Sequence, residues 1–268
     1  MAPPALSPQA IHQGTGRLWL YVPEPATGAR LLLNTDGSPA QSSTIAAWAT
    51  LTAVAVGQQI KDSNGNTEIC IVGGTTGATQ PTTWPTAPGP GLMATKDGSA
   101  YWVFAGGAYG AYFAGASEGA TTAALNPKYQ DVGADQVSLP IDEIMTADAY
   151  ELDVVLKQTN LANLVNFYSP GTFSAGTDTL QPAGAQAYEQ ITFGGIIPLI
   201  KMGVAVISPR RDVVGKYVVS HLYQAYAAEA FKLAFQREKE TTYSVKFKAI
   251  ADTTRNNGDY AGMIWRQV

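Results

Sequence analysis

Hydrophobic and polar residues alternate along several stretches of the chain, and an alternation with a period of two predicts β-strands. In the clearest example, 148–156, four apolar side chains share one face, whereas Glu151 and Asp153 lie on the opposite face. Similar runs rich in β-forming residues predict further strands at 17–22, 29–33, 52–56, 67–72, 99–104, 138–141, 190–193, 196–208, 231–235 and 243–249. The pattern therefore predicts a mainly β chain.

One segment has a helical period instead. Leu161, Leu164, Val165 and Tyr168 are spaced as the apolar stripe of a helix. Thr159 or Asn160 can cap its start and Pro170-Gly171 ends it, so we expect one helix beside the sheets. The segment 216–230 fits both a helix and a strand.

The segment 46–105 differs in texture from the rest of the chain. It contains Trp48, Trp84 and Trp102 among the five tryptophans, and its short β runs are separated by dense turn signals such as Asn64-Gly65 and Asp97-Gly98. This predicts a small all-β module inserted into a main domain formed by 1–45 and 106–268, with Gly106–Gly119 as a linker. A module of this size needs large side chains for its core. The three tryptophans are therefore candidates for that core, and the alternative is a platform that contacts glycans.

The charge of the chain limits its surface chemistry. Charged residues make up 14% of the 268 residues, below the roughly 25% usual in soluble domains. Such a surface suits extensive contact with neighbouring subunits, although a weakly charged secreted β protein is an alternative. The net charge of −4 and the absence of a basic stripe in the sequence disfavour tight binding of nucleic acid.

The sequence lacks a convincing set of catalytic or metal-binding residues. Cys70 is the single cysteine and lies between two isoleucines, which predicts a buried, unreactive thiol; the only histidines are His12 and His221. Gly115-Ala116-Ser117-Glu118-Gly119 has the form of a nucleophile elbow, but the expected preceding hydrophobic strand and following helix are missing. We therefore expect no enzyme activity, no cofactor and no metal. We also expect no signal peptide and no membrane span.

Three short motifs outside 46–105 support a family resemblance. They are Gly115-x-Ser-Glu-Gly-x-Thr121, Asp135-Gln-x-x-x-Pro140 and Phe247-x-Ala-x-x-Asp-x-x-Arg-x-x-Gly-Asp259. With the strand and helix pattern between them, they resemble the tail-tube, or major tail, proteins of long-tailed bacteriophages. The segment 46–105 departs from the simplest members and looks like a small β module found on various phage structural proteins.

The resemblance implies a two-sheet β-sandwich with one flanking helix, the tail-tube fold. It further implies a virion structural protein that forms homohexameric rings, which stack into the conduit for DNA ejection. Its partners would be other copies of itself, other tail proteins at the ends of the tube and DNA in transient, non-specific passage, with no membrane involved. The protein would be made in the host bacterial cytoplasm and reside in the phage tail.

Two questions remain open at the level of sequence. Glu151 and Asp153 are candidates for carboxylates that face the lumen of such a tube, because mild negative charge would prevent DNA from adhering. The outer surface is the alternative position for them. The alternative function is a tail-tip, fibre or decoration subunit that binds a host surface through the segment 46–104.

Overall fold

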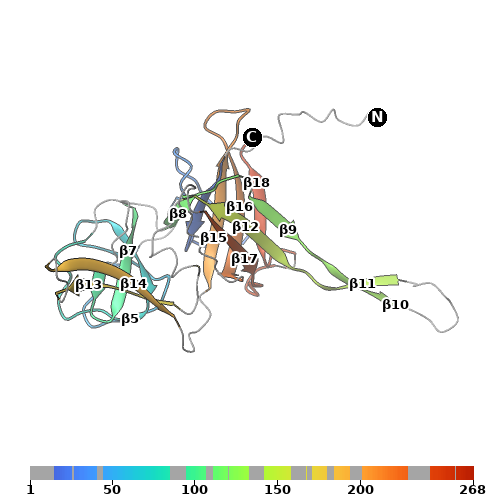
Figure 1. Ribbon diagram of the computed structural model, residues 1–268. Helices are drawn as coiled ribbons and strands as arrows, with labels where there is room; N and C mark the ends of the chain where they lie inside the picture. Colours follow the sequence, from blue (N-terminus) through green and yellow to red (C-terminus); the bar gives the residue numbers. More distant parts are fainter. Residues whose placement is uncertain are drawn as a thin grey trace.

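The computed structural model describes residues 15–25, 27–40, 45–84, 95–106, 111–119, 121–132, 142–157, 167, 171–179, 184–193, 201–228, 242–256 and 258–268. The chain is mainly β, as predicted, and its strand pairs are antiparallel (Figure 1). The strands are β1 (Arg17–Leu20), β2 (Ala53–Val54), β3 (Gln59–Lys61), β4 (Thr67–Val72), β5 (Gly74–Thr75), β6 (Thr95–Asp97), β7 (Ala100–Gly106), β8 (Tyr112–Ala116), β9 (Thr122–Leu125), β10 (Lys128–Val132), β11 (Asp142–Ala147), β12 (Tyr150–Leu156), β13 (Gly171–Asp178), β14 (Gln186–Phe193), β15 (Met202–Pro209), β16 (Tyr217–Ala227), β17 (Tyr243–Ala249) and β18 (Gly262–Arg266).

An eight-stranded sheet, called the main sheet below, forms the centre of the molecule. Its order is β8-β1-β15-β16-β17-β12-β9, and β18 pairs with β16 off this path. The sheet curls until the end of β8 meets β12, where Ser117 pairs with Leu156 and the Lys157 amide donates to the Ala116 carbonyl at 3.2 Å. The hydrophobic core therefore lies inside one curled sheet, which gives the fold its sandwich-like character.

Alternation along the strands decides which side chains enter this core. β12 buries its even-numbered residues and leaves Glu151 and Asp153 partly exposed, as the sequence pattern predicts. In β1, Leu18 and Leu20 face the interior cluster, whereas Trp19 belongs to a second cluster on the opposite face. Successive residues of a strand point to opposite faces, so one strand supplies both clusters.

The segment 216–230, which fitted both a helix and a strand, contains the long strand β16. One edge of β16 pairs with β15, and its other edge is shared by two strands. Val218–Leu222 pair with β18, and Ala225–Ala227 pair with β17. The outer edge of β18 has no partner among the described strands.

The strands of the segment 46–105 pair with one another, in a four-stranded sheet, β3-β4-β7-β6, and a small β2-β5 pair. Cys70 and Trp102 face a cluster of the segment's own side chains. Ile69 and Val103 face the opposite way and join the cluster that fills the main sheet. We call these strands the insert; its sheet contributes to two hydrophobic cores at once.

Two ribbons of two strands each complete the fold. Figure 1 shows the β10–β11 ribbon, called the arm below, extending away from the main sheet on the side opposite the insert. The second ribbon, β13–β14, pairs along eight residues of each strand. Of the four ribbon strands, only β14 was predicted in part, by the strand expected at 190–193. The residues of the other three strands lack a clear alternation of apolar and polar side chains.

Two of the predicted local structures are wrong. The segment 29–33 is not a strand; it forms only an isolated bridge between Leu33 and Pro39, and Pro39 has no amide with which to extend a ladder. The predicted linker 106–119 instead contains β8, which pairs with β1 and buries Tyr112 and Ala114. Small residues allow this strand to bend where the sheet closes, since its register with β1 shifts at Leu18.

The two expected two-residue turns also differ from the prediction. The Asp97-Gly98 site is a two-residue turn, but its central residues are Gly98 and Ser99, because Asp97 pairs with Ala100. Gly98 has a φ of 64°, which glycine adopts without strain. The Asn64-Gly65 turn belongs to a longer loop, because the flanking pair is Lys61 with Thr67.

The predicted helix lies outside the described residues except for Phe167. Phe167 has helical geometry and is buried. Its ring meets the Phe247 ring edge-to-face, with centroids 6.1 Å apart. This contact places one aromatic side chain from the segment between β12 and β13 against the core of the main sheet.

Candidate functional site

A buried ionic cluster surrounds Arg255 in the connection between β17 and β18. The Arg255 side chain is only 2% exposed. Its Nε donates to Glu24 at 3.1 Å and lies 3.4 Å from Asp252, and its Nη1 donates to Asp259 at 2.9 Å. Nη2 donates to the Pro25 carbonyl. Arg255 thereby joins the segment that follows β1 to the segment that precedes β18.

The same guanidinium group stacks on an aromatic ring of the main sheet. The Arg255 Cζ lies 3.5 Å from the centroid of the Tyr223 ring, a cation–π arrangement. The Tyr223 hydroxyl donates to Asp259 at 2.6 Å, so Asp259 binds both partners. A planar group with five donors suits this arrangement better than an ammonium group does.

Three carboxyl groups, those of Glu24, Asp252 and Asp259, surround this single cation. Burial and a hydrogen bond with Asp252 raise the pKa of Glu24 above its usual range. The hydrogen bond from Glu24, with those from Thr254, lowers the pKa of Asp252 to about 2. The two pKa shifts are opposite in direction, as expected for two neighbouring carboxyl groups beside one cation.

His221 lies next to this cluster on β16 and is fully buried. Its ring meets the Tyr223 ring edge-on, with centroids 5.3 Å apart. Neither ring nitrogen has a hydrogen-bond partner among the described residues. Burial, with a smaller contribution from Arg255, lowers the pKa of His221 to about 3, so the imidazole is neutral. His221 is therefore a neutral, buried side chain packed beside Tyr223.

The candidate lumen residues Glu151 and Asp153 lie on the outer face of β12 beside two lysines. Glu151 is directly opposite Lys248 and Asp153 is directly opposite Lys246 on β17. The Lys246 Nζ lies 4.0 Å from an Asp153 carboxylate oxygen. Opposite charges on directly facing residues stabilise a sheet modestly. This face therefore carries charge of both signs.

The three tryptophans of the insert belong to one cluster. Trp84 and Trp102 are buried and Trp48 is partly exposed. The indole N–H groups of Trp48 and Trp102 both donate to Asp97 Oδ2, at 2.8 and 3.1 Å. The Gly77 amide donates to the other oxygen of Asp97 at 2.7 Å. Asp97, which the sequence pattern indicates only as a turn residue, therefore holds two of the three indole rings of the insert core in place.

A second buried carboxyl group in the insert has no such partners. Glu68 on β4 is fully buried, and neither carboxyl oxygen has a hydrogen-bond partner in the described part of the chain. Burial, with a smaller contribution from Asp62, raises the pKa of Glu68 to about 9. Glu68 is therefore protonated at neutral pH. Its position inside the apolar run 67–72 was the sequence signal that could have identified it.

The two residues considered as nucleophiles both have structural contacts. Ser117 is buried, and its Oγ accepts a hydrogen bond from the Gly16 amide at 2.8 Å where β8 meets β12. The Cys70 thiol donates to the Val72 carbonyl at 3.1 Å, and burial raises its pKa to about 12. A protonated, buried thiol is a poor nucleophile.

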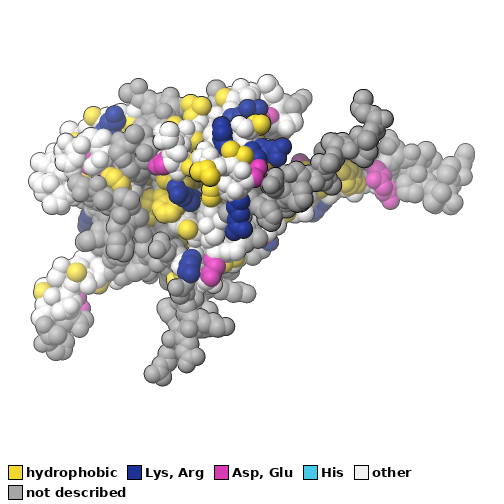
Figure 2. All heavy atoms as spheres, turned by 90° about the horizontal axis from the view of Figure 1, so that it is seen from above, with side chains coloured by type: hydrophobic (Ala, Val, Ile, Leu, Met, Phe, Trp, Pro, Cys, Tyr) yellow, Lys and Arg dark blue, Asp and Glu magenta, His cyan; other side chains and the backbone are white. Residues whose placement is uncertain are grey.

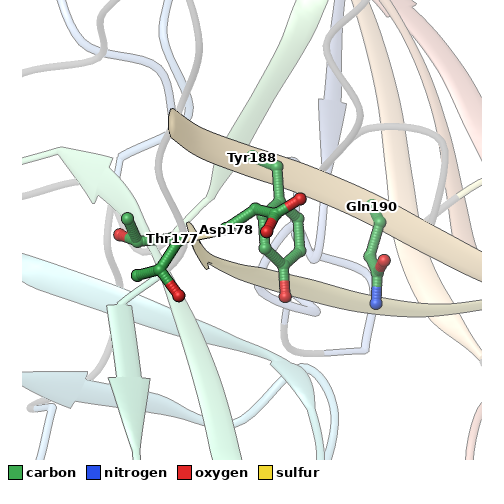
Figure 3. Close-up of a pocket in the computed structure, with 5 residues that line it drawn as sticks. Thr177, Asp178, Tyr188 and Gln190 are labelled. Carbon is green, nitrogen blue, oxygen red and sulfur yellow. The ribbon is translucent and has the colours of Figure 1, made fainter. Parts of the chain in front are cut away.

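The β13–β14 ribbon bears a polar hollow of about 430 Å³. Figure 3 shows Tyr188 and Gln190 projecting from β14 to one side, with the Asp178 carboxylate beside the Tyr188 ring and Thr177 farther along β13. These groups can form hydrogen bonds with a polar molecule. They include no pair of residues suited to acid–base or nucleophilic catalysis.

Within the described part of the chain, neither a metal-binding cluster nor a membrane-spanning helix is present. No group of three or more His, Cys, Asp and Glu side chains is placed to hold a metal ion. No helix in the described part is long and apolar enough to cross a membrane.

No model of a known protein family matches the chain, and no curated protein sequence matches it significantly. The chain's own geometry must therefore indicate its function. The contacts of Arg255, Asp97 and Ser117 hold segments together, which is typical of residues that stabilise a structure.

Proposed function

We propose that this chain is a self-assembling structural subunit, the tail-tube or major tail protein of a long-tailed bacteriophage. The observation that favours assembly is that two ribbons of only two strands each, β10–β11 and β13–β14, stand apart from the larger sheets. A two-stranded ribbon is marginally stable alone in water, and it needs further strands or a packing partner. Neighbouring subunits would supply that partner.

The exposure of apolar side chains on these ribbons supports the proposal. Leu125, at the base of the arm, is 63% exposed, and Tyr129 on β10 is 59% exposed. Tyr188 on the other ribbon is 43% exposed. Apolar side chains that gather on projecting elements are typical of surfaces that become covered in a complex.

The free edge of the main sheet is a second supporting feature. β18 pairs with β16 on one side, and its outer edge has no strand partner among the described residues. Ile264, in the middle of β18, is 60% exposed. An unprotected edge of this kind invites pairing with another chain, and closure into a ring of subunits would remove it.

The residues of the third sequence motif support the resemblance to tail-tube proteins in a different way. Asp252, Arg255 and Asp259 are not scattered surface charges; they form one cluster that fixes the connection between β17 and β18. The motif thus corresponds to a single structural task. A fold that is exposed to mechanical load in a tube would gain from such a fixed connection.

The finer features of the proposal follow from the resemblance. The subunits would form homohexameric rings that stack into a tube, with other tail proteins at its ends and DNA passing through it. Each subunit would be a tail-tube sandwich with a flanking helix, and 46–105 would be an added domain on the outside. The protein would reside in the virion and would have no enzyme activity.

Glu151 and Asp153 remain candidates for the lumen wall. Their pairing with Lys248 and Lys246 would leave the wall close to neutral along this pair of strands. A neutral wall also avoids adhesion of DNA, because binding to phosphates requires cations that are not already neutralised.

The test is the assembly state of the purified full chain, measured by sedimentation velocity and negative-stain electron microscopy. Rings or tubes whose abundance increases with protein concentration are expected. A monomer at all concentrations up to about 1 mM, where even weak contacts of about −4 kcal/mol are half occupied, would contradict assembly. A compact trimer would favour the alternative of a tail-tip, fibre or decoration subunit.

A further inference from the structure

One end of the main sheet concentrates positive charge. The turn between β15 and β16 and the end of β18 meet there, because Arg210 donates to the Gln267 carbonyl at 2.6 Å and the Gln267 amide donates to Tyr217 at 2.9 Å. The start of β1 lies beside them, since Arg17 pairs with Ile207. The cations of this surface, called the basic end, are Arg17, Arg210, Arg211, Lys216 and Arg266, and its acids are Asp36 and Asp212.

This concentration is unusual for the chain as a whole. The basic end holds five of the 17 Lys and Arg and two of the 21 Asp and Glu, which gives it a charge of +3. Since the net charge is −4, the remainder of the chain has a charge of −7. Figure 2 looks down on the molecule from above and shows the Lys and Arg side chains gathered over this part of the main sheet.

Apolar side chains accompany the charge. Val214, at the tip of the β15–β16 turn, is 97% exposed, and Val213 beside it is 38% exposed. Arg211 precedes them and is also exposed. A partner that fits this surface would therefore combine carboxylates with an apolar or aromatic side chain.

The arm presents that combination. Asp131 and Glu143 are directly opposite each other on β10 and β11, and both are exposed. Tyr129 is two residues before Asp131 on the same strand, so it projects from the same face of the ribbon. One face of the arm thus presents two carboxylates and an aromatic ring that is 59% exposed.

The arm does not reach the basic end of its own chain. Figure 1 shows the arm extending sideways from the main sheet, whereas the C-terminus, which follows β18, lies at the upper end of that sheet. The two complementary surfaces therefore face different directions and can meet only between molecules.

We infer that the acidic face of the arm of one copy binds the basic end of a second copy. The inference rests on the proposed self-assembly and specifies which surfaces form a contact and in which sense. Because the two surfaces differ, the contact is head-to-tail, and repetition of such a contact gives a closed ring or an open stack. Charges at the rim of a contact mainly speed association and are screened by salt.

The test uses two charge-reversal variants of the full chain. The arm variant is Asp131→Lys with Glu143→Lys, and the basic-end variant is Arg211→Glu with Arg266→Glu. Ser63→Lys, between β3 and β4, and Lys96→Glu, on β6, are exposed controls within the insert for the two directions of charge change. Self-association is measured by sedimentation velocity at about 50 and 500 mM salt, which spans strong and weak screening.

Each double variant alone should associate at least about tenfold more weakly than the unchanged chain at low salt, where opposing charges would meet at every contact. The controls should be unchanged. An equimolar mixture of the two double variants should associate again, because each reversed surface now finds its complement on the other chain. Misfolded variants could not recover on mixing.

Three results would overturn the inference. One is undiminished association of either double variant alone while the unchanged chain still assembles; this result would leave the proposed function intact. Another is failure of the mixture to recover. The third is a basic-end variant that no longer binds a fluorescent DNA duplex but still self-associates. This result would show that the basic end binds the phosphates of nucleic acid and not the arm. Absence of assembly in the unchanged chain would contradict the proposed function itself.

Discussion

Arg255 and Tyr223 form a stacked pair, and Asp259 is hydrogen-bonded to both residues. The guanidinium lies 3.5 Å from the Tyr223 ring centroid, and the two carboxylate oxygens of Asp259 accept hydrogen bonds from the Tyr223 hydroxyl and from Arg255 Nη1. Tyr223 belongs to β16, and the other two residues belong to the connection between β17 and β18. The pair therefore attaches an irregular connection to the longest strand of the main sheet.

Replacement of Arg255 should strongly destabilise the fold. Arg255→Met would leave Glu24, Asp252 and Asp259 without their common cation, and loss of one partner of a buried ionic group costs about 3–5 kcal/mol. Arg255→Lys should recover little, because an ammonium group cannot serve these carboxylates and stack on Tyr223 together. Urea unfolding monitored by circular dichroism measures both. Arg211→Met, an exposed control, should remain within about 0.5 kcal/mol of the unchanged chain. Equal stability of Arg255→Met would contradict the prediction.

Asp97→Ala should loosen the core of the insert. It removes the acceptor of the Trp48 and Trp102 indole groups and of the Gly77 amide. Each buried donor left without a partner costs about 1–3 kcal/mol. Tryptophan fluorescence should shift to longer wavelength, and amide exchange should increase in 46–84 and 95–106. The matched variant Asp131→Ala, on the exposed arm, should change neither measurement within the insert.

Glu68 should make the folded state less stable as the pH rises. Its pKa is about 9 in the folded state against an ordinary value of 4.5, so the folded state retains a proton that the unfolded chain loses. The stability present below pH 4.5 is therefore lost as the pH rises toward 9, by roughly 3 kcal/mol at pH 7. Glu68→Gln should remove this slope between pH 5 and 9. The same slope in Glu68→Gln as in the unchanged chain would show that Glu68 is not the cause. Glu118→Gln, on the surface, should retain it.

His221 should make the folded state less stable as the pH falls. Its pKa is about 3 in the folded state against an ordinary value of 6.5, so the unfolded chain binds a proton first. The stability present above pH 6.5 is lost as the pH falls toward 3, by up to about 5 kcal/mol. His221→Leu should flatten that part of the stability profile. It should also remove two buried nitrogens that have no hydrogen-bond partner among the described residues. Unfolding in urea across pH 4 to 7 compares the two chains. Parallel curves would refute the assignment.

Charge reversal on β12 tests the lumen assignment of Glu151 and Asp153. In Glu151→Lys with Asp153→Lys, four lysines would face one another across β12 and β17, which should cost about 1 kcal/mol and add cations to the wall. A matched control adds Lys246→Glu and Lys248→Glu and so restores the pairs. If these residues line the lumen, the double variant alone should slow DNA ejection, most strongly at low salt. Unchanged rate and salt dependence in normally assembled tails would refute the lumen assignment.

Alternation in the sequence was sufficient to predict strands whose two faces differ in environment. β12 and β17 each have one buried and one solvated face. The apolar Leu152 and the charged Glu151 therefore indicate from the sequence alone which face each occupies. β8 escaped prediction because Gly and Ala have no clear polarity, and its strand state depends on the distant strands β1 and β12. The apolar run Leu31–Leu33 was wrongly predicted as a strand. Apolar residues can pack against a sheet without pairing with its strands.

The candidate site residues divide in the same way. The outward direction of Glu151 and Asp153 follows from the period of two, but their lysine partners depend on the register between β12 and β17. The motif with Asp252, Arg255 and Asp259 could be recognised in the sequence. Its partners Glu24 and Tyr223 could not, because they come from segments far away along the chain. A pattern within one strand is local information, and a cluster assembled from several segments is not.

The pairing of β1 with β15 has a consequence for the order in which the chain acquires its structure. Leu18 pairs with Val206, so β1 leaves the ribosome long before its central partner exists. Loop closure over such a separation is slow, and an apolar strand with open edges promotes aggregation in the meantime. The insert, whose strands pair among near neighbours, can form first and offer Ile69 and Val103 as an apolar surface. Its position ahead of β15 in the chain would then allow it to cover β1 in the nascent protein until β15 is made.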